Sequence, residues 1–429
     1  METVPKSLRL HIAFFGRTNV GKSTFLNLIS GQEVAITSPL PGTTTDVVEK
    51  VMELLPLGPV VLLDTAGIDD TTELGSLRIR RTLQVFNRAD VVVVICEAGL
   101  WGEPEESILA EARNRKLPVI AVVNKCDLNA PDPDFIARLR DAGVAAVMTA
   151  DCSSSGRRDD VVADFKRALI DCAPEDFLES PPLVGDLLPT GGLAALIVPI
   201  DSQAPKGRLI LPQVQTIRDA LDNGAMAAMV REREYPKFLA RLKTPPDLVV
   251  CDSQVVDRMV AETPPGVTST TFSILFSRLK GDMELMARGC AVIDRLVDGD
   301  KILIAEACSH HAADDDIGRV KIPRWLRRYT GAELQVEVCA GRDYPDNLSE
   351  FRLVIHCGGC MFTRREILSR LQVAAKAGVP VTNYGMCISF VQGVLERVLS
   401  PFPSALQAFR DARGDAGERR GKTTAGGKA

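Results

Sequence analysis

The stretch that decides the fold of the first third of the chain is residues 10–23, Leu10-His11-Ile12-Ala13-Phe14-Phe15-Gly16-Arg17-Thr18-Asn19-Val20-Gly21-Lys22-Ser23. Its first six residues are an apolar run of the kind that forms a buried strand. The remainder is a complete G-x-x-x-x-G-K-S loop, and residues 24–29 continue as a helix. Such a loop between a strand and a helix predicts a site for nucleotide phosphates.

The chemistry of this loop assigns a role to each part of it. Backbone N–H groups surround the phosphate oxygens, Lys22 reaches the β- and γ-phosphates, and the Ser23 hydroxyl binds Mg²⁺. The residues expected to contact the nucleotide are Gly16, Asn19, Val20, Gly21, Lys22, Ser23 and Thr24.

Further motifs follow in the order expected of a GTP-binding domain. The apolar run 60–63 leads into Asp64-Thr65-Ala66-Gly67, where Asp64 is expected to hold Mg²⁺ through water and Gly67 to sense the γ-phosphate. Between the two motifs, Thr44 in the segment 41–46 is the expected Mg²⁺ ligand of a mobile switch. A later strand leads into Asn124-Lys125-Cys126-Asp127. The Asp127 carboxylate of this N-K-x-D motif accepts two hydrogen bonds that guanine offers and adenine does not, so the motif predicts GTP.

Composition limits the classes of protein that fit. With 429 residues, 45% of them hydrophobic and 25% charged, the chain is expected to fold into several α/β domains. A net charge of −5 argues against a nucleic-acid partner. The sequence has no apolar run of membrane-spanning length and no signal-peptide pattern at its start. Eleven cysteines, several inside apolar runs, indicate free thiols in a reducing, cytoplasmic environment.

The middle of the chain, residues 176–265, alternates strand and helix patterns. Strands are expected at 194–198, 225–230 and 247–251, with helices after each of them. This order predicts a small parallel sheet. About 85 residues make a thin core for an independent unit, so we expect this part to dimerise. The alternative is a monomeric module packed on its neighbours.

The last part of the chain carries two short cysteine- and histidine-rich runs. The first is Glu306-Ala307-Cys308-Ser309-His310-His311 and the second is His356-Cys357-Gly358-Gly359-Cys360, with 45 residues between His310 and His356. Each follows a predicted strand, at 301–304 and 353–355, at the sheet edge where ligands bind in open α/β folds. The inventory fits a zinc site or an iron–sulfur cluster on Cys308, Cys357 and Cys360. The fourth position of such a cluster is then held by Glu306, His310 or His356, or is left open. The alternative without a metal is a set of buried thiols or a redox pair.

The first domain resembles the translation-factor-like GTPases of the Era, TrmE and EngA group. The resemblance rests on the four motifs above and covers about 170 residues. In that group an asparagine at the position of Asn19 goes with a K⁺ ion that assists hydrolysis. Ile68 stands where Ras-like proteins have a catalytic glutamine, so hydrolysis is expected to be slow.

Over nearly its whole length the chain resembles the maturation GTPases of iron-only (FeFe) hydrogenases. The resemblance rests on the GTPase motifs followed by Cys-x-His and His-Cys-x-x-Cys, and on residues 204–213 and 316–324. It implies an α/β protein of three domains, with a P-loop GTPase domain and two smaller parallel-sheet domains. The expected ranges are 1–175 for GTP binding, 176–265 for dimerisation, 266–410 for the cluster and 411–429 for a disordered tail.

The same resemblance implies a function. The protein would hydrolyse GTP, form a homodimer, bind a 4Fe–4S cluster, and assemble and deliver the two-iron precursor of the hydrogenase active site. Its partners would be radical-SAM maturases and the immature FeFe-hydrogenase. Two other readings remain: a ribosome- or tRNA-associated GTPase with a structural zinc, and a C-x-x-C thiol oxidoreductase fused to a GTPase.

Overall fold

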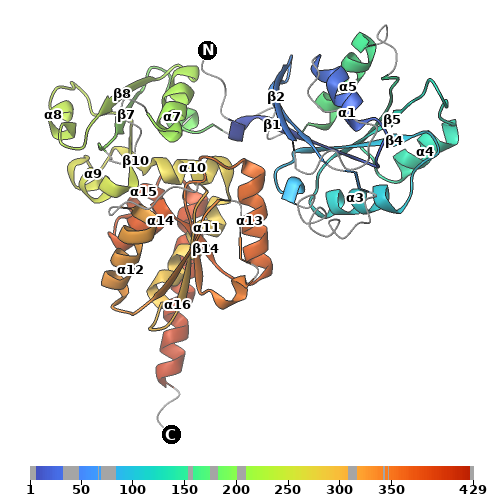
Figure 1. Cartoon of the computed structure of the whole chain (residues 1–429). Coiled ribbons are helices and arrows are strands. Elements are labelled where there is room, and N and C mark those ends of the chain that lie inside the picture. The colour runs from blue at the N-terminus through green and yellow to red at the C-terminus, as the bar shows by residue number, and fades with distance from the viewer. Residues whose placement is uncertain are drawn as a thin grey trace. The chain divides into compact units, whose positions relative to one another are not determined.

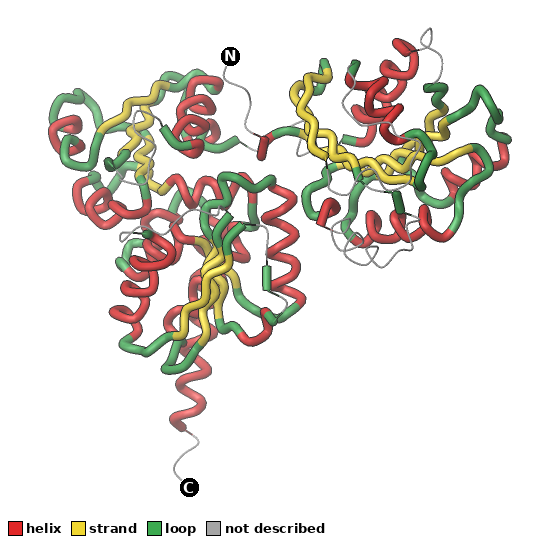
Figure 2. Tube along the Cα trace, in the orientation of Figure 1, coloured by secondary structure: helices red, strands yellow, loops and turns green. Residues whose placement is uncertain are grey.

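The structure is a computed structural model of the chain that describes residues 6–31, 48–65, 67–68, 84–152, 158–173, 182–200, 209–307, 316–341, 344–345 and 347–425. Side chains are described up to residue 414. The chain forms two compact units, Met1–Ser180 and Pro181–Ala429. Figure 2 shows the strands, which belong to three sheets, one in the first unit and two in the second.

The first unit contains a six-stranded sheet in the order β2-β3-β1-β4-β5-β6. Only β2 runs antiparallel to its neighbour, and the other neighbouring strands pair in parallel. The strands are β1 (Leu10–Gly16), β2 (Val48–Leu54), β3 (Gly58–Asp64), β4 (Val91–Glu97), β5 (Val119–Asn124) and β6 (Ala146–Thr149). The helices are α1 (Lys22–Ser30), α3 (Glu103–Asn114), α4 (Pro133–Asp141) and α5 (Arg158–Cys172).

Strand β1 is buried on both faces, which is why its sequence is a continuous apolar run. Ile12 and Phe14 pack with Phe25 of α1 and Phe165 of α5 on one face. Ala13 and Phe15 pack with helices α3 and α4 on the other. Figure 1 shows α1 and α5 on one side of the sheet and α3 on the other. The sandwich holds the end of β1 rigidly where the phosphate loop begins.

The second unit holds two four-stranded sheets in which all pairs are parallel. The first has the order β10-β9-β7-β8, with β7 (Leu193–Ile197), β8 (Met226–Val230), β9 (Leu248–Cys251) and β10 (Thr268–Thr271). Its helices are α7 (Leu211–Asp222), α8 (Tyr235–Leu239) and α9 (Val256–Glu262). The alternation predicted for residues 176–265 is therefore present.

The other sheet has the order β12-β11-β13-β14, with β11 (Lys301–Ala305), β12 (Gln335–Cys339), β13 (Leu353–His356) and β14 (Val381–Asn383). Its helices are α10 (Phe272–Lys280), α11 (Met283–Cys290), α12 (Ile322–Thr330), α13 (Arg364–Lys376), α14 (Tyr384–Val391), α15 (Leu395–Leu399) and α16 (Pro403–Ala425). The fold class predicted from the sequence, a P-loop domain followed by two parallel-sheet α/β domains, is confirmed.

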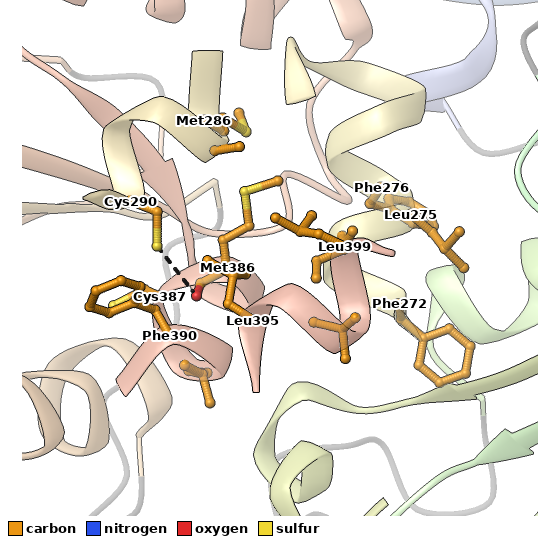
Figure 3. Close-up of a cluster of buried hydrophobic side chains, with 14 of the residues drawn as sticks. Phe272, Leu275, Phe276, Met286, Cys290, Met386, Cys387, Phe390, Leu395 and Leu399 are labelled. Atoms are coloured by element: carbon orange, nitrogen blue, oxygen red, sulfur yellow. Dashed lines mark hydrogen bonds between the residues drawn. The ribbon is translucent and has the colours of Figure 1, made fainter. Parts of the chain in front are cut away.

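One hydrophobic core runs through both sheets of the second unit. Figure 3 shows part of it, where Phe272 and Phe276 of α10 lie among side chains of α11, α14 and α15. Cys290 and Cys387 are buried in this apolar cluster, and burial raises the pKa of both thiols. Side chains of α10 belong to this core, so the helix packs against elements of both sheets.

Two expected boundaries need correction. The second sheet does not end at residue 265, because β10 pairs in parallel with β9 beyond that point. The chain is also not irregular from residue 411, since α16 continues to Ala425. Arg413 forms an ion pair with Asp294, and Arg295 donates to the Ala412 carbonyl oxygen, so the first turn of the expected tail is attached to the domain.

None of the described helices is long and apolar enough to cross a membrane.

Candidate functional site

The phosphate loop lies between β1 and α1, as the sequence predicts. Gly21 has φ 94°, and a Cβ built there would lie 2.3 Å from Asn124 Nδ2, so this position requires glycine. Asn124 in turn donates from Nδ2 to the Val20 carbonyl oxygen at 2.9 Å. The asparagine of the N-K-x-D motif therefore holds the phosphate loop in place, a contact between residues 104 positions apart.

Two charged groups of the nucleotide motifs are buried beside this loop. Lys22 Nζ donates to the carbonyl oxygens of Gly16 at 2.8 Å and Arg17 at 2.7 Å. Asp64 is 5% exposed, and its Oδ1 has no hydrogen-bond partner among the described residues. Burial raises the pKa of Asp64 to about 6, and the nearby Lys22 ammonium partly opposes this. A buried carboxylate oxygen without a partner fits the water shell of a bound Mg²⁺.

The guanine-reading motif lies at the carboxyl end of β5. Lys125 has φ 59° and forms an ion pair with Glu97 at 2.5 Å. The backbone N–H of Cys126 donates to the Ala150 carbonyl oxygen at 3.3 Å, and Asp127 is exposed. The motif therefore lies at the same edge of the sheet as the phosphate loop.

An ion pair that the sequence did not indicate supports the phosphate loop. Arg17 donates from Nε and Nη2 to the two carboxylate oxygens of Glu105, at 2.7 and 2.8 Å. Glu105 is fully buried, and its Oε2 also accepts from the Gly102 N–H at the start of α3. These hydrogen bonds lower the pKa of Glu105, although burial opposes them. No local pattern marks residues 88 positions apart as partners.

At the second site, β11 and β13 place the start of the first run, Glu306 and Ala307, beside the second run. They are neighbouring parallel strands with Ala305 opposite His356, so both runs leave the sheet at the same edge. The Cys357 sulfur accepts from the Ala307 N–H at 3.1 Å and from the Gly359 N–H at 3.4 Å. Gly359 adopts φ 61°, which permits the tight turn between the two cysteines.

Some of the predicted metal ligands lie outside the described residues. These are Cys308 and His310, and at the nucleotide site the same holds for Thr44. Within the described part of the chain, no three histidine, cysteine, aspartate or glutamate side chains gather as a metal-binding group.

Glu306 and His356 each have protein partners. Glu306 is buried, receives hydrogen bonds from Arg319 at 3.0 and 3.2 Å, and lies 3.4 Å from the Tyr384 hydroxyl oxygen. His356 Nδ1 lies 3.0 Å from the Cys357 carbonyl oxygen, and its Nε2 lies 3.3 Å from Arg370 Nη1. Burial and the Arg370 charge lower the pKa of His356 to about 4, so its imidazole is neutral.

Two buried cations flank the C-x-x-C loop, and sequence reasoning did not find either. The Arg370 guanidinium carbon lies 4.8 Å from the centre of the Tyr344 ring and 4.4 Å from that of Phe362. Lys280, at the end of α10, donates to carbonyl oxygens of the loop, and burial lowers its pKa to about 8. A buried Lys is rare, and its position at the end of an apolar helix was the one signal in the sequence.

The phosphate loop, Asp64 and the N-K-x-D motif, gathered at one edge of a largely parallel sheet, define a P-loop GTPase domain, here joined to two parallel-sheet α/β domains. Comparison with family models agrees. Residues 11–125 match the 50S ribosome-binding GTPase model. Residues 183–281 match the hydrogen maturase F dimerization domain, and residues 284–401 match the hydrogen maturase F tetramerization domain.

The chain therefore belongs to the hydrogen maturase F family, whose members are hydrogenase-maturation GTPases. Two of its domains match models named for oligomerisation, which agrees with the expectation that the protein oligomerises.

Individual relatives that are similar to this chain match a little over a quarter of it. The tRNA modification GTPase MnmE of Synechococcus sp. strain JA-3-3Ab is 46% identical over 125 residues, which are 28% of this chain and 26% of that protein. The MnmE of Nitrosospira multiformis is 36% identical over 124 residues, 29% and 27% of the two chains. The chain thus spans about a quarter of the length of these relatives.

Among solved structures, Era in complex with MgGDPNP and part of 16S ribosomal RNA is 21% identical, with a TM-score of 0.34. The match covers 52% of this chain and 91% of that one. Toc33 from Arabidopsis thaliana with Mg²⁺ and GMPPNP is 14% identical, with a TM-score of 0.30, and covers 38% and 86% of the two chains. Likeness at this level carries no functional argument.

Proposed function

We propose that this protein hydrolyses GTP and serves as a scaffold for hydrogenase maturation. In this role it carries a resident 4Fe–4S cluster, receives a two-iron precursor as cargo and delivers it to immature FeFe-hydrogenase. Radical-SAM maturases would supply the precursor. The observation that carries the proposal is the contact between the Ala307 N–H and the Cys357 sulfur, because Cys308 is the next residue after Ala307.

The nucleotide site supports GTP hydrolysis. Lys22 would leave the Gly16 and Arg17 carbonyl oxygens to bind the β- and γ-phosphates, and Ser23 and Thr44 would complete the Mg²⁺ shell with Asp64 behind it. Gly67 would report the γ-phosphate to the switch, and Asn19 would hold K⁺. Since Ile68 offers no side-chain hydrogen bond to a water, hydrolysis would be slow and stimulated by K⁺.

The C-x-x-C loop supports a thiolate-bound cluster. Two N–H groups already point at the Cys357 sulfur, and these donors stabilise a thiolate. Helix α13 begins at Arg364, directly after the loop, so its positive end also favours negative charge there. Cys308, Cys357 and Cys360 would hold the cluster, with Glu306, His310 or His356 at the fourth iron. Bound there, the cluster supplies one iron whose ligand is exchangeable, which three cysteines permit and four would not.

Dimerisation would use the first sheet of the second unit. Strand β8 is an edge strand of this sheet, and it leaves Met226 and Met229 exposed by 55% and 36%. Apolar side chains and unpaired backbone groups on an edge strand favour pairing with another chain. The family model named for dimerisation covers this region.

Anaerobic reconstitution of the full chain tests the proposal. We expect about four irons per chain and, after dithionite reduction, a fast-relaxing S = 1/2 EPR signal that added imidazole perturbs. Glu306→Gln and His310→Ala would then show which side chain completes the site. One tightly bound zinc with no iron would contradict the scaffold function and favour a GTPase with a structural zinc domain.

A further inference from the structure

Lys280 is the most buried charged side chain near the C-x-x-C loop that no motif explains. It is 2% exposed, and its Nζ donates to three carbonyl oxygens of one short segment: Gly359 at 3.2 Å, Cys360 at 3.1 Å and Phe362 at 2.8 Å. All three partners are backbone oxygens around the second cysteine. An ammonium group has three N–H donors, so it can donate to all three carbonyl oxygens.

The contacts also determine which way the loop faces. Because the carbonyl oxygens of residues 359, 360 and 362 turn toward one point on α10, the peptide groups that follow these residues have a defined orientation. In the adjoining peptide group, the Gly359 N–H is directed at the Cys357 sulfur at 3.4 Å. Arg364, just after the loop, donates from Nη1 to the Leu279 carbonyl oxygen of α10 at 2.7 Å. Hydrogen bonds therefore run in both directions between α10 and the loop segment.

Among the described residues, the surroundings of Lys280 leave little room for a separate ligand. The recess between α10 and the loop is lined by residues such as Phe276, Met286 and Ile367 and has a volume of about 10 Å³, room for one water at most. Lys280 therefore acts on the protein's own loop. On the same helix, Arg278 donates to Asp186 Oδ1 at 2.8 Å, so α10 is also attached to the segment that precedes the first sheet of the second unit.

We propose that Lys280 is a positioning residue for the cluster site, which holds the C-x-x-C loop in its ligand-binding shape and offsets part of the cluster's negative charge. The inference rests on the proposed cluster function. It also makes α10 the element through which the dimerisation domain contacts the metal site, since α10 lies within the range of the dimerization family model and the loop lies within the tetramerization one.

The first measurement uses the metal-free full chain. In Lys280→Met, three loop carbonyl oxygens each lose a hydrogen bond, so the amides of residues 357–363 should exchange hydrogen at least about ten-fold faster than in the native protein. Amides of β11 should be unchanged, which shows that the domain is folded. The matched control is Lys376→Met on α13, where the lysine is exposed. In this variant the C-x-x-C loop should exchange at the native rate. Native exchange of the loop in Lys280→Met would overturn the proposal.

The second measurement uses the reconstituted protein and separates charge from hydrogen bonding. Loss of a nearby positive charge makes reduction harder, so Lys280→Met and Lys280→Gln should both shift the reduction potential of the cluster downward, whereas Lys280→Arg should stay near the native value. Unchanged potentials in both neutral variants would overturn the charge role. If the native chain itself takes up no iron, the cluster function fails, and the exchange experiment still decides whether Lys280 holds the loop.

Discussion

The nucleotide site and the C-x-x-C site lie at the carboxyl edges of parallel sheets, but the sequence encodes them differently. The phosphate loop is one continuous segment of the chain. Within it, Gly21 supplies the left-handed backbone conformation and Lys22 supplies the positive charge. The second site is assembled from β11, β13 and α10, and its buried charges come from residues scattered along the chain. A sequence motif therefore predicts the residues that bind the ligand. The residues that support them come from distant parts of the chain and are found only in the tertiary structure.

The largest expected effect separates the two sites. Lys22→Ala removes the cation that would neutralise the β- and γ-phosphates, so GTP hydrolysis should fall by about 100- to 1000-fold. The iron content after reconstitution should match that of the native protein. Phosphate release and iron analysis of the same preparation check this, with Lys166→Ala on α5 as the control. Loss of iron in Lys22→Ala would show that the two sites do not fold independently.

The converse substitution should give the opposite pattern. Cys357→Ala removes a sulfur that two backbone N–H groups surround, so iron should fall from about four per chain to well below one, while GTP hydrolysis stays native. The control is Cys172→Ser in α5, at a position distant in sequence from the C-x-x-C loop. This variant should take up as much iron as the native protein. Native iron content in Cys357→Ala would remove this residue from the ligand set.

A smaller effect tests the support of the phosphate loop. Glu105→Gln leaves Arg17 without its buried carboxylate partner, which should cost about 1–3 kcal/mol of stability in the first domain and weaken GTP binding. Glu106→Gln changes a neighbouring exposed glutamate and should have little effect on either. Denaturant unfolding and nucleotide titration measure both quantities. Equal stability of the two variants would mean that the ion pair does not support the loop.

The smallest effect belongs to an exposed ion pair at the opposite end of the cluster domain's sheet. Lys301 and Glu350 are 2.7 Å apart and both partly exposed. Because water screens such pairs, Glu350→Gln should leave both the stability and the iron content close to the native values. Thermal unfolding of the metal-free chain checks this. A large loss would indicate that charges in this domain are coupled beyond their direct contacts.

The sequence predicted the elements well where one physical signal dominated. The run Leu10–Gly16 forms a strand because both faces are buried, and β11 and β13 follow from their short apolar runs in the same way. It failed at β10, a Thr- and Ser-rich strand, Thr268–Thr271, whose composition does not resemble a buried core strand. Its pairing with β9 and the packing around it decide that structure, and neither is a local property.

By itself the sequence determined the GTPase motifs, the three-domain α/β class and the two runs that carry the candidate cluster ligands. Local spacing sufficed because strand, loop and ligand are adjacent in the chain. Only the tertiary structure decided that Ala305 and His356 lie opposite each other, that Glu105 supports Arg17, and that Lys280 holds the second cysteine's loop. A buried charge is stable only when it is paired with another polar or charged group. Which group that is depends on how segments distant in the sequence pack together.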